Sequence, residues 1–269
     1  MWRIFVGAAV TVTASFLFEW LAVPIYLKLS LKGGDDEELR RNYAKKAARC
    51  SYQATYFTVA TIWGYMALKE TEYLPFWMGG KNTTSDSYNS LFANVPFSSY
   101  SNAVFNYFLY TTGYHFGGFM THVLFNRGNN DFQEMLLHHI ATLALMTGSF
   151  FSNFMRIGAC IAWLHDIGQI PLQTSKVLSA TNYKLSTLCF FAVSIVLWIV
   201  TRLVWFAFFI YVTFTLDPSE ITGYDAPLTI CLRTNAIYLS SLYLLHIYWF
   251  TLFLKIAHNA IKGGQAEDI

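Results

Sequence analysis

This chain is built around seven long apolar stretches separated by short polar connections. They cover roughly residues 4–31, 50–68, 101–126, 132–150, 154–172, 185–214 and 227–257. A helix needs about 20 mostly apolar residues to cross a bilayer, and each stretch reaches or approaches that length. Only 13% of the residues are charged, which is about half the share in a soluble domain. The sequence therefore predicts an all-α, polytopic transmembrane helix bundle of about seven spans.

Basic residues in the connections predict which side of the membrane each connection faces. The segment 32–49 carries six lysines or arginines, whereas the connection 69–100 carries two. Cytosolic loops are enriched in Lys and Arg, so we expect 32–49 to be a cytosolic hinge and 69–100 to be lumenal. The second connection also holds Asn82-Thr83-Thr84, an N-glycosylation pattern that only a lumenal loop can use. Alternation along seven spans then places the N-terminus in the lumen and the C-terminus in the cytosol.

Three parts follow from this organisation. Residues 1–49 form a first transmembrane helix and the charged cytosolic hinge, residues 50–257 a six-helix transmembrane domain, and residues 258–269 a short polar tail. The first stretch contains Glu19 and Pro24 and is longer than the core of a signal peptide, so we expect a helix that is retained.

Composition and motifs exclude several classes of function. The formal net charge is +2 and no basic patch is visible, so nucleic acid is not an expected partner. The four cysteines show neither CxxC nor Cys/His metal spacing, so no disulfide framework is expected. The sequence has no Gly-rich phosphate loop and no GxSxG motif. The chemistry must then come from polar residues inside the membrane.

Two pairs of ionisable residues lie inside apolar stretches, where such residues indicate a functional site. The fourth stretch holds His138 and His139, and the fifth holds His165 and Asp166. With Asp131 as the expected N-cap of the fourth helix, His138 lies about 10 Å from the cytosolic end. The fifth helix runs the opposite way and brings its pair to a similar depth. We therefore predict one shared site, with a ring nitrogen of the histidine pair within direct or one-water reach of His165 or Asp166.

Each candidate also has a structural interpretation. Adjacent histidines on a helix point about 100° apart, so we expect one of the pair to face the site and the other to support it. A metal site is disfavoured, because the HxxxH and ExxH spacings of membrane di-iron enzymes are absent. His115 and His122 share a face of the third helix and either line the same cavity or pair with polar neighbours. We read His246, which lies among aromatic residues, as structural.

We further expect an elongated, mostly apolar cavity between these helices and the third or sixth stretch, open to the cytosolic side. Its expected walls are Trp163, Phe150 and the aromatic residues near Trp205. Arg156 and Lys176 lie near helix ends, where a basic side chain can simply reach toward water.

The stretch from Asp131 to Lys176 resembles the signature of the ceramide synthase branch of the TLC (TRAM, longevity-assurance and CLN) domain family. That signature is similar to D-F-x-x-M-x-x-H-H-x-x-T, S-x-x-x-N-x-x-R-x-G and H-D-x-[SA]-D-x-x-L-[ED]-x-x-K. The matching residues are Asp131, Phe132, Met135, His138, His139, Thr142, Ser149, Asn153, Arg156, Gly158, His165, Asp166, Leu172 and Lys176. Thr201-Arg202-Leu203 also resembles the family's next helix. Gln169 and Gln173 stand where the pattern has acidic residues.

The resemblance implies a TLC-domain-like fold and N-acylation of a sphingoid base at the endoplasmic reticulum membrane. Acyl-CoA is then a co-substrate, membrane lipids are the surroundings, and no cofactor is tightly bound. The implied catalytic residues are His138 and His139 as base or nucleophile, with Asp166 orienting His165. We expect Asn153, Arg156 and Lys176, together with Trp163 of the expected cavity wall, to contribute to substrate binding.

A second interpretation stays open at this point. Gln169 and Gln173 remove negative charge from the helix that carries His165, which weakens any carboxylate that tunes a histidine. The chain would then be a catalytically reduced TLC-domain protein, acting as a lipid-binding or structural subunit of a larger membrane protein complex. That role implies other membrane protein subunits or a homodimer as partners, and an organelle inner membrane as an alternative location.

Overall fold

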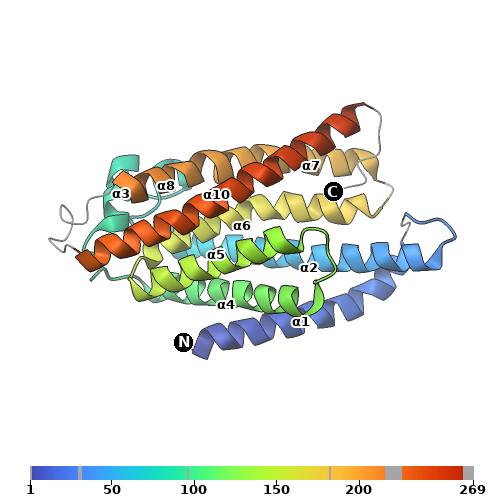
Figure 1. Ribbon diagram of the computed structural model, residues 1–269, viewed down its shortest axis with the longest axis horizontal. Coiled ribbons are helices and arrows are strands. Elements are labelled where there is room, and N and C mark those ends of the chain that lie inside the picture. Colours follow the sequence, from blue (N-terminus) through green and yellow to red (C-terminus); the bar gives the residue numbers. More distant parts are fainter. Residues whose placement is uncertain (1, 30–31, 96, 182, 216–225, 263–269) are drawn as a thin grey trace.

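The computed structural model describes residues 2–29, 32–95, 97–181, 183–215 and 226–262 as a bundle of long helices (Figure 1). Within these residues the structure contains helices, turns and one isolated bridge between Pro75 and Asn82. The long helices are α1 (Trp2–Lys28), α2 (Glu37–Leu68), α4 (Asn102–Phe125), α5 (Phe132–Phe151), α6 (Met155–Ser179) and α10 (Ala226–Ile261). The predicted all-α fold is confirmed.

One further rod is continuous but irregular at its centre. Helix α7 (Lys184–Trp198) passes into a π-helical segment, η2 (Ile199–Val204), and then into α8 (Trp205–Thr215). Segments of π-helix often mark functional sites. This segment carries Arg202, whose side chain is buried.

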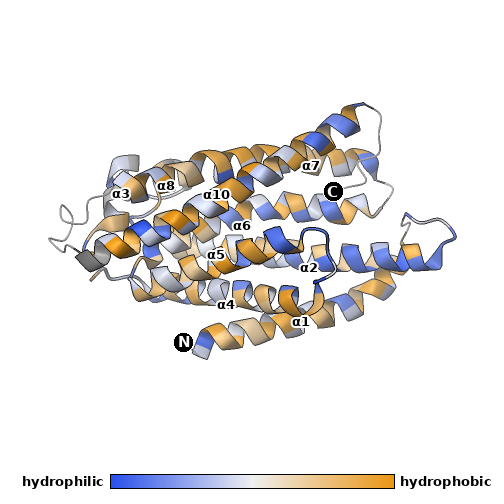
Figure 2. Ribbon diagram, viewed as in Figure 1, coloured by the Kyte–Doolittle hydropathy of each residue, from blue (hydrophilic) through white to orange (hydrophobic). Residues whose placement is uncertain are grey.

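Among the described residues, three helical rods are long and apolar enough to cross a membrane: Trp2–Lys28, Lys184–Thr215 and Thr229–Ile261. They correspond to the first, sixth and seventh predicted spans. The other long helices are more polar because they carry the histidines and other polar residues that line the interior. In Figure 2, apolar colour covers most of the rods, and hydrophilic residues gather at the end of the bundle where α2 begins.

The predicted cytosolic hinge 32–49 is mostly helical, contrary to the expectation of a connection between two helices. Helix α2 begins at Glu37, and the Asp36 side chain accepts a hydrogen bond from the Leu39 amide at 2.9 Å. Two acidic residues in the first turn also favour this start. The basic residues interrupt the apolar pattern but not the helix. The connection 69–100 likewise contains a 3-10 turn, η1 (Phe76–Met78), and a short helix, α3 (Thr84–Phe92).

Helix α5 starts where predicted, but the prediction that the Asp131 side chain caps it is wrong. The Asp131 side chain makes no capping hydrogen bond, because its backbone (φ −97°, ψ 19°) is not in the extended conformation that a capping side chain uses. At the other end of α5, Asn153 adopts a left-handed conformation (φ 58°) that turns the chain into antiparallel α6. Asparagine tolerates this conformation better than most residues.

The helices come together through small residues and buried aromatic side chains. A Cβ on Gly113 of α4 would lie 2.9 Å from the Gly7 Cα of α1, so these two backbones are in direct contact. Helix α6 lies between α2 and α7, and the main core gathers Leu68, Tyr107 and Met155 around it. The predicted polar tail from residue 263 onward lies outside the described residues.

Candidate active site

A cavity of about 370 Å³ runs through the middle of the bundle. Helix α5 lines it with one face, because the lining residues recur at helical spacing: Met135, His138, His139, Thr142, Leu145, Met146 and Ser149. This face runs over 15 residues from Met135 to Ser149, a rise of about 21 Å at 1.5 Å per residue. The opposite walls include apolar residues: Phe57, Ile157, Ile161, Phe206, Leu239 and Leu242. The predicted elongated, mostly apolar cavity is present.

Both histidines of the α5 pair line this cavity, rather than only one. Their rings diverge as their adjacent positions require. His138 contacts the Trp249 ring of α10 at 5.5 Å between centroids, and His139 contacts the His122 ring of α4 at 5.3 Å. Both rings reach the cavity although they point in different directions. Neither buried Nδ1 has a hydrogen-bond partner among the described residues.

His165 on α6 also lines the cavity, and its tautomer follows from its surroundings. Its Nδ1 lies 2.9 Å from the carbonyl oxygen of Ile161, which can only accept a hydrogen bond. The Nδ1–H therefore donates, and Nε2 of the neutral ring is left as an acceptor. The ring packs between His246 and Phe206, with centroids 5.2 and 5.0 Å away.

Asp166 contributes a buried carboxylate at the same level of the cavity. It is 1% exposed and accepts a hydrogen bond from the Tyr107 hydroxyl of α4 at 3.1 Å. Adjacent positions on α6 direct Asp166 and His165 apart, and no hydrogen bond joins them in the described structure. The carboxylate thus does not orient the ring directly. Nor does any direct hydrogen bond link the α5 histidines to His165 or Asp166 in the residues that are described.

Arg202 and His246 form a buried polar group that the sequence analysis did not assign to the site. Nη1 of Arg202 donates to Nε2 of His246 at 3.2 Å, and Nη2 donates to the His165 carbonyl oxygen at 3.0 Å. The guanidinium also lies 4.8 Å from the Trp198 ring centroid. A charged residue in so apolar a stretch was the signal that could have identified Arg202. Through the His165 carbonyl oxygen, Arg202 ties η2 to the segment of α6 that carries His165.

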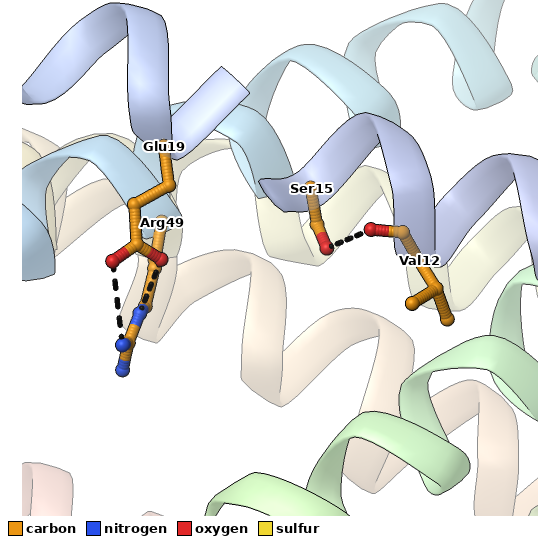
Figure 3. Close-up of polar contacts among 4 residues, drawn as sticks. All are labelled: Val12, Ser15, Glu19 and Arg49. Atoms are coloured by element: carbon orange, nitrogen blue, oxygen red, sulfur yellow. Dashed lines mark hydrogen bonds and ion pairs between the residues drawn. The ribbon is translucent and has the colours of Figure 1, made fainter. Parts of the chain in front are cut away.

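One end of the cavity is its mouth. Three lining residues are exposed, Phe16, Arg49 and Phe125, and they lie together on α1, α2 and α4. The Phe16 and Phe125 rings meet edge to face at 5.3 Å. Beside them Arg49 pairs with Glu19 through Nε at 2.9 Å and Nη2 at 3.4 Å (Figure 3). Because Phe125 ends α4, the mouth lies at the end of the bundle beside the turn 126–131, which the sequence predicts to be cytosolic.

The other end of the cavity reaches past the histidines toward the predicted lumenal side. Phe154, Thr213, Leu232 and Asn235 line it there. The Asn235 amide lies close to α5, since a Cβ on Gly148 would be 2.9 Å from its Oδ1. The histidines therefore lie partway along the cavity, with apolar space on the far side.

His115 and His122 also line the cavity, as one interpretation of their spacing predicted. Nε2 of His122 lies 3.0 Å from the Phe132 carbonyl oxygen and donates to it, so this ring also ties α4 to the start of α5. Gln169 and Gln173 line the cavity too. Nε2 of Gln173 donates to Oε1 of Gln169 at 3.4 Å, and the buried Oε1 of Gln173 has no partner among the described residues.

Four residues predicted to contribute to substrate binding are not among those that line the cavity: Asn153, Arg156, Trp163 and Lys176. Arg156 instead donates to the carbonyl oxygens of Ser90 at 2.7 Å and Ser99 at 3.1 Å. It thereby anchors the connection 69–100 to α6. Asn153 donates to the Ser98 carbonyl oxygen at 2.9 Å in the same region. Their part in substrate binding stays a prediction.

Trp163 and Lys176 lie on other faces of α6. The Trp163 Nε1–H donates to the Thr61 carbonyl oxygen of α2 at 3.0 Å. Of the expected cavity walls, Trp163 and Trp205 line a separate void of about 50 Å³, whereas Phe206, beside Trp205, lines the main cavity. Phe150 packs against the main core. Lys176 is half-buried in the last turn of α6.

The arrangement combines proton-accepting groups with a long apolar channel. Neutral imidazoles with free ring nitrogens can take up a proton or a hydrogen bond from a reacting group. The described residues contain no group of three or more His, Cys, Asp or Glu side chains placed to hold a metal ion. A lipid chain fits the apolar length, and a polar group at its end would reach the histidines.

Comparison with known proteins gives a consistent result. The TLC domain family matches residues 46–255. Ceramide synthase hyl-2 of Caenorhabditis elegans is 28% identical over 272 residues, covering 94% of this chain and 77% of the relative. Ceramide synthase 1 LOH3 of Arabidopsis thaliana is 26% identical over 271 residues, covering 94% and 82%. Ceramide synthase 5 of Homo sapiens is 28% identical over 176 residues, covering 65% and 44%. The chain is therefore a membrane protein that belongs to the TLC domain family, in its ceramide synthase branch.

Proposed function

We propose that this protein is a ceramide-synthase-like N-acyltransferase that transfers a long acyl chain from acyl-CoA to the amino group of a sphingoid base. The observation that carries the proposal is the placement of His138, His139, His165 and Asp166 along one elongated, mostly apolar cavity. Relatives named ceramide synthase across most of the chain support the same reaction class.

The reaction needs a proton acceptor and a donor for the developing oxyanion. The amine nitrogen attacks the thioester carbonyl, a C–N bond forms and the C–S bond breaks. A sphingoid base enters as an ammonium ion, so its nitrogen gives one proton to water before it attacks and a second one to the base as the amide forms. The departing thiolate of coenzyme A takes up that second proton. A ring nitrogen of His138 or His139, which both line the cavity, serves as the base, or as the nucleophile that first accepts the acyl group. His165 keeps Nε2 free for a second proton-transfer role.

The cavity geometry suits two substrates of different polarity. The acyl chain lies in the apolar part beyond the histidines, while coenzyme A stays in water at the mouth beside Arg49. Acyl-CoA is then a freely exchanging co-substrate, and the reaction uses no tightly bound cofactor. Hydrogen-bonding groups along the wall, such as Thr142, would orient the thioester.

The membrane setting belongs to the proposal as well. Seven spans put the mouth on the cytosolic side and the connection 69–100 in the lumen of the endoplasmic reticulum. The bilayer is then also crossed by α2, α4, α5 and α6. Their polar residues face the bundle interior, where neighbouring helices shield them from lipid. Lipids and the two substrates are the proposed partners, and a homodimer or other membrane subunits remain compatible with this site.

Turnover by the purified protein tests the proposal. Given acyl-CoA and a sphingoid base, wild-type protein should release the thiol of coenzyme A and form the amide, measured by thiol titration and mass spectrometry. We expect His138→Ala or His139→Ala to lower the rate by a factor of about one hundred or more, as for loss of a general base. His258→Ala is the matched control, because His258 is exposed near the end of α10 and outside the cavity lining.

Two results would contradict the proposal. One is wild-type protein that stays folded but inactive with a broad panel of amines and acyl-CoAs. The other is an unchanged rate in both α5 histidine variants. An inactive protein that is nevertheless required for assembly of a larger membrane complex would point to the structural role instead.

A further inference from the structure

Helix α1 lies outside the region that matches the TLC domain, yet it forms part of the cavity wall. Its lining residues are Thr11, Ser15, Phe16 and Glu19. Three of them are polar and recur every four residues, so they form one stripe along an otherwise apolar spanning helix. Polar residues inside a spanning helix indicate function. The stripe leads from the mouth toward the interior.

Charge distinguishes the outer end of this stripe from the rest of the cavity. Four described lining residues are formally charged: Glu19, Arg49, Asp166 and Arg202. The inner two are 1% and 2% exposed, and each is bound to buried partners. The outer two are accessible, with side chains 21% exposed for Glu19 and 60% for Arg49. Glu19 is thus the acidic lining residue that an entering molecule can reach.

The Glu19–Arg49 pair is built to exchange partners. It is a partly exposed ion pair, and pairs of this kind contribute little to stability. If Glu19 turns to another cation, the Arg49 guanidinium remains in contact with water, so no buried charge is left uncompensated. Ser15 lies one turn away and donates its own hydroxyl to the Val12 carbonyl oxygen at 2.8 Å, which leaves its lone pairs as acceptors (Figure 3). The Glu19 carboxylate and the Ser15 hydroxyl can both accept hydrogen bonds, and an ammonium group can only donate them.

We propose that Glu19 is the residue that binds the ammonium group of a long-chain amine at the cavity mouth, exchanging Arg49 for the amine. This inference deepens the proposed function and rests on it, because it assigns the head-group site of the amine substrate. The Phe16 and Phe125 rings flank the apolar tail, and the polar stripe from Ser15 to Thr11 receives a hydroxyl next to the amine. Helix α1 therefore completes a site that the TLC domain alone leaves open.

Binding and kinetics together test this assignment in the full-length protein. Binding of radiolabelled octadecylamine is measured without acyl-CoA, so no turnover is required, and octadecanol serves as the neutral probe of the same length. We expect Glu19→Gln to weaken octadecylamine binding about ten- to hundredfold, the loss expected for a charge-assisted hydrogen bond, with octadecanol binding unchanged. The same variant should raise the KM for a sphingoid base by a similar factor and leave the KM for acyl-CoA unchanged.

Two further variants separate recognition from a purely structural ion pair. Arg49→Gln removes the internal competitor, so we expect amine binding to tighten about two- to fivefold. A structural pair predicts instead that both variants weaken binding alike. Glu70→Gln is the matched control, because it breaks the Lys81–Glu70 ion pair (2.7 Å) outside the cavity. Glu19→Asp should restore part of the lost binding.

The outcomes distinguish the inference from the proposed function. Amine binding that depends on Glu19 in a protein without turnover supports the inference and removes the acyltransferase. Turnover with an amine KM that Glu19→Gln leaves unchanged overturns the inference and keeps the acyltransferase. Equal losses of octadecylamine and octadecanol binding would also overturn it, since they indicate damage to the apolar mouth.

Discussion

At the scale of single residues, Arg202 shows how a buried charge supports this site. Its guanidinium bonds His246 and the His165 carbonyl oxygen and faces the Trp198 ring. Arg202→Leu would leave both acceptors buried without a donor. We expect it to destabilise the protein by about 2–5 kcal/mol, measured as a lower Tm in detergent. Arg202→Lys should also be defective, because an ammonium group cannot reproduce the planar fork.

Arg127→Leu is the control for Arg202. Its side chain is exposed in the turn after α4 and donates to the nearby Val123 carbonyl oxygen. A substitution at such a surface position should change stability by no more than about 0.5 kcal/mol. Equal Tm shifts in the two variants would refute a special role for Arg202.

Gln169 and Gln173 permit a second prediction at this scale, since both line the cavity where the family pattern has acidic residues. Gln173 keeps an unpartnered buried Oε1 in the described structure, so the position tolerates an acceptor. We expect Gln169→Asp with Gln173→Glu to leave turnover equal to wild type or to raise it, measured as release of coenzyme A. A wild type that is inactive while this double variant turns over would identify the two glutamines as inactivating. A large loss of activity in the folded double variant would refute the prediction.

The sequence predicted the depth of the site residues but not their partners. His138, His139, His165 and Asp166 reach one cavity because helical rise fixes depth from the nearest helix end. The partner of each side chain depends on how each helix is rotated about its axis, and that rotation is set by neighbours far away in the sequence. Tyr107 as the donor to Asp166 could therefore not be predicted from the fourth and fifth stretches alone.

At the scale of helices, the contact between α1 and α4 depends on glycine. A Cβ on Gly113 would lie 2.9 Å from both the Gly7 Cα and the Ile4 carbonyl oxygen, which are backbone atoms that cannot move aside alone. We expect Gly113→Ala to cost about 1–3 kcal/mol and to loosen α1, measured as a lower Tm and faster proteolysis within α1. Gly128→Ala makes the same substitution where nothing lies within 4 Å, and its Tm should match wild type.

The helices also show where local patterns mislead. Apolar periodicity marked the second stretch as beginning near residue 50, but α2 begins at Glu37, because capping and acidic first-turn residues support helix even in a charged segment. Conversely, Asp131 has the residue type of a cap without the backbone geometry for one. Residue type predicts the ends of helices only where the backbone adopts the matching conformation.

At the scale of the whole molecule, the long apolar stretches correctly predicted the all-α class. The predicted number of spans depends on whether helices with polar residues on one face are counted. Three rods are apolar enough by themselves. Helices α2, α4, α5 and α6 carry the cavity lining on their inner faces, and this lowers their mean hydropathy without exposing those groups to lipid. A count based on each helix alone leaves out any helix whose polar residues face the interior, so the seven-span arrangement stays a prediction.

Glycosylation at Asn82 separates the two span counts. With seven spans, α1 and α2 cross in succession and the connection 69–100 lies in the lumen. With only the three apolar rods crossing, every residue from the end of α1 to the start of α7 stays on the cytosolic side. Asn82-Thr83-Thr84 is an acceptor sequence in that connection, and glycan addition requires the lumen. We therefore expect full-length protein in cells to carry an N-glycan that endoglycosidase removes and that Asn82→Gln abolishes. Wild-type protein without a glycan, in cells that glycosylate a control protein, would contradict the seven-span arrangement. It would also move the connection that Arg156 anchors to the same side as the cavity mouth.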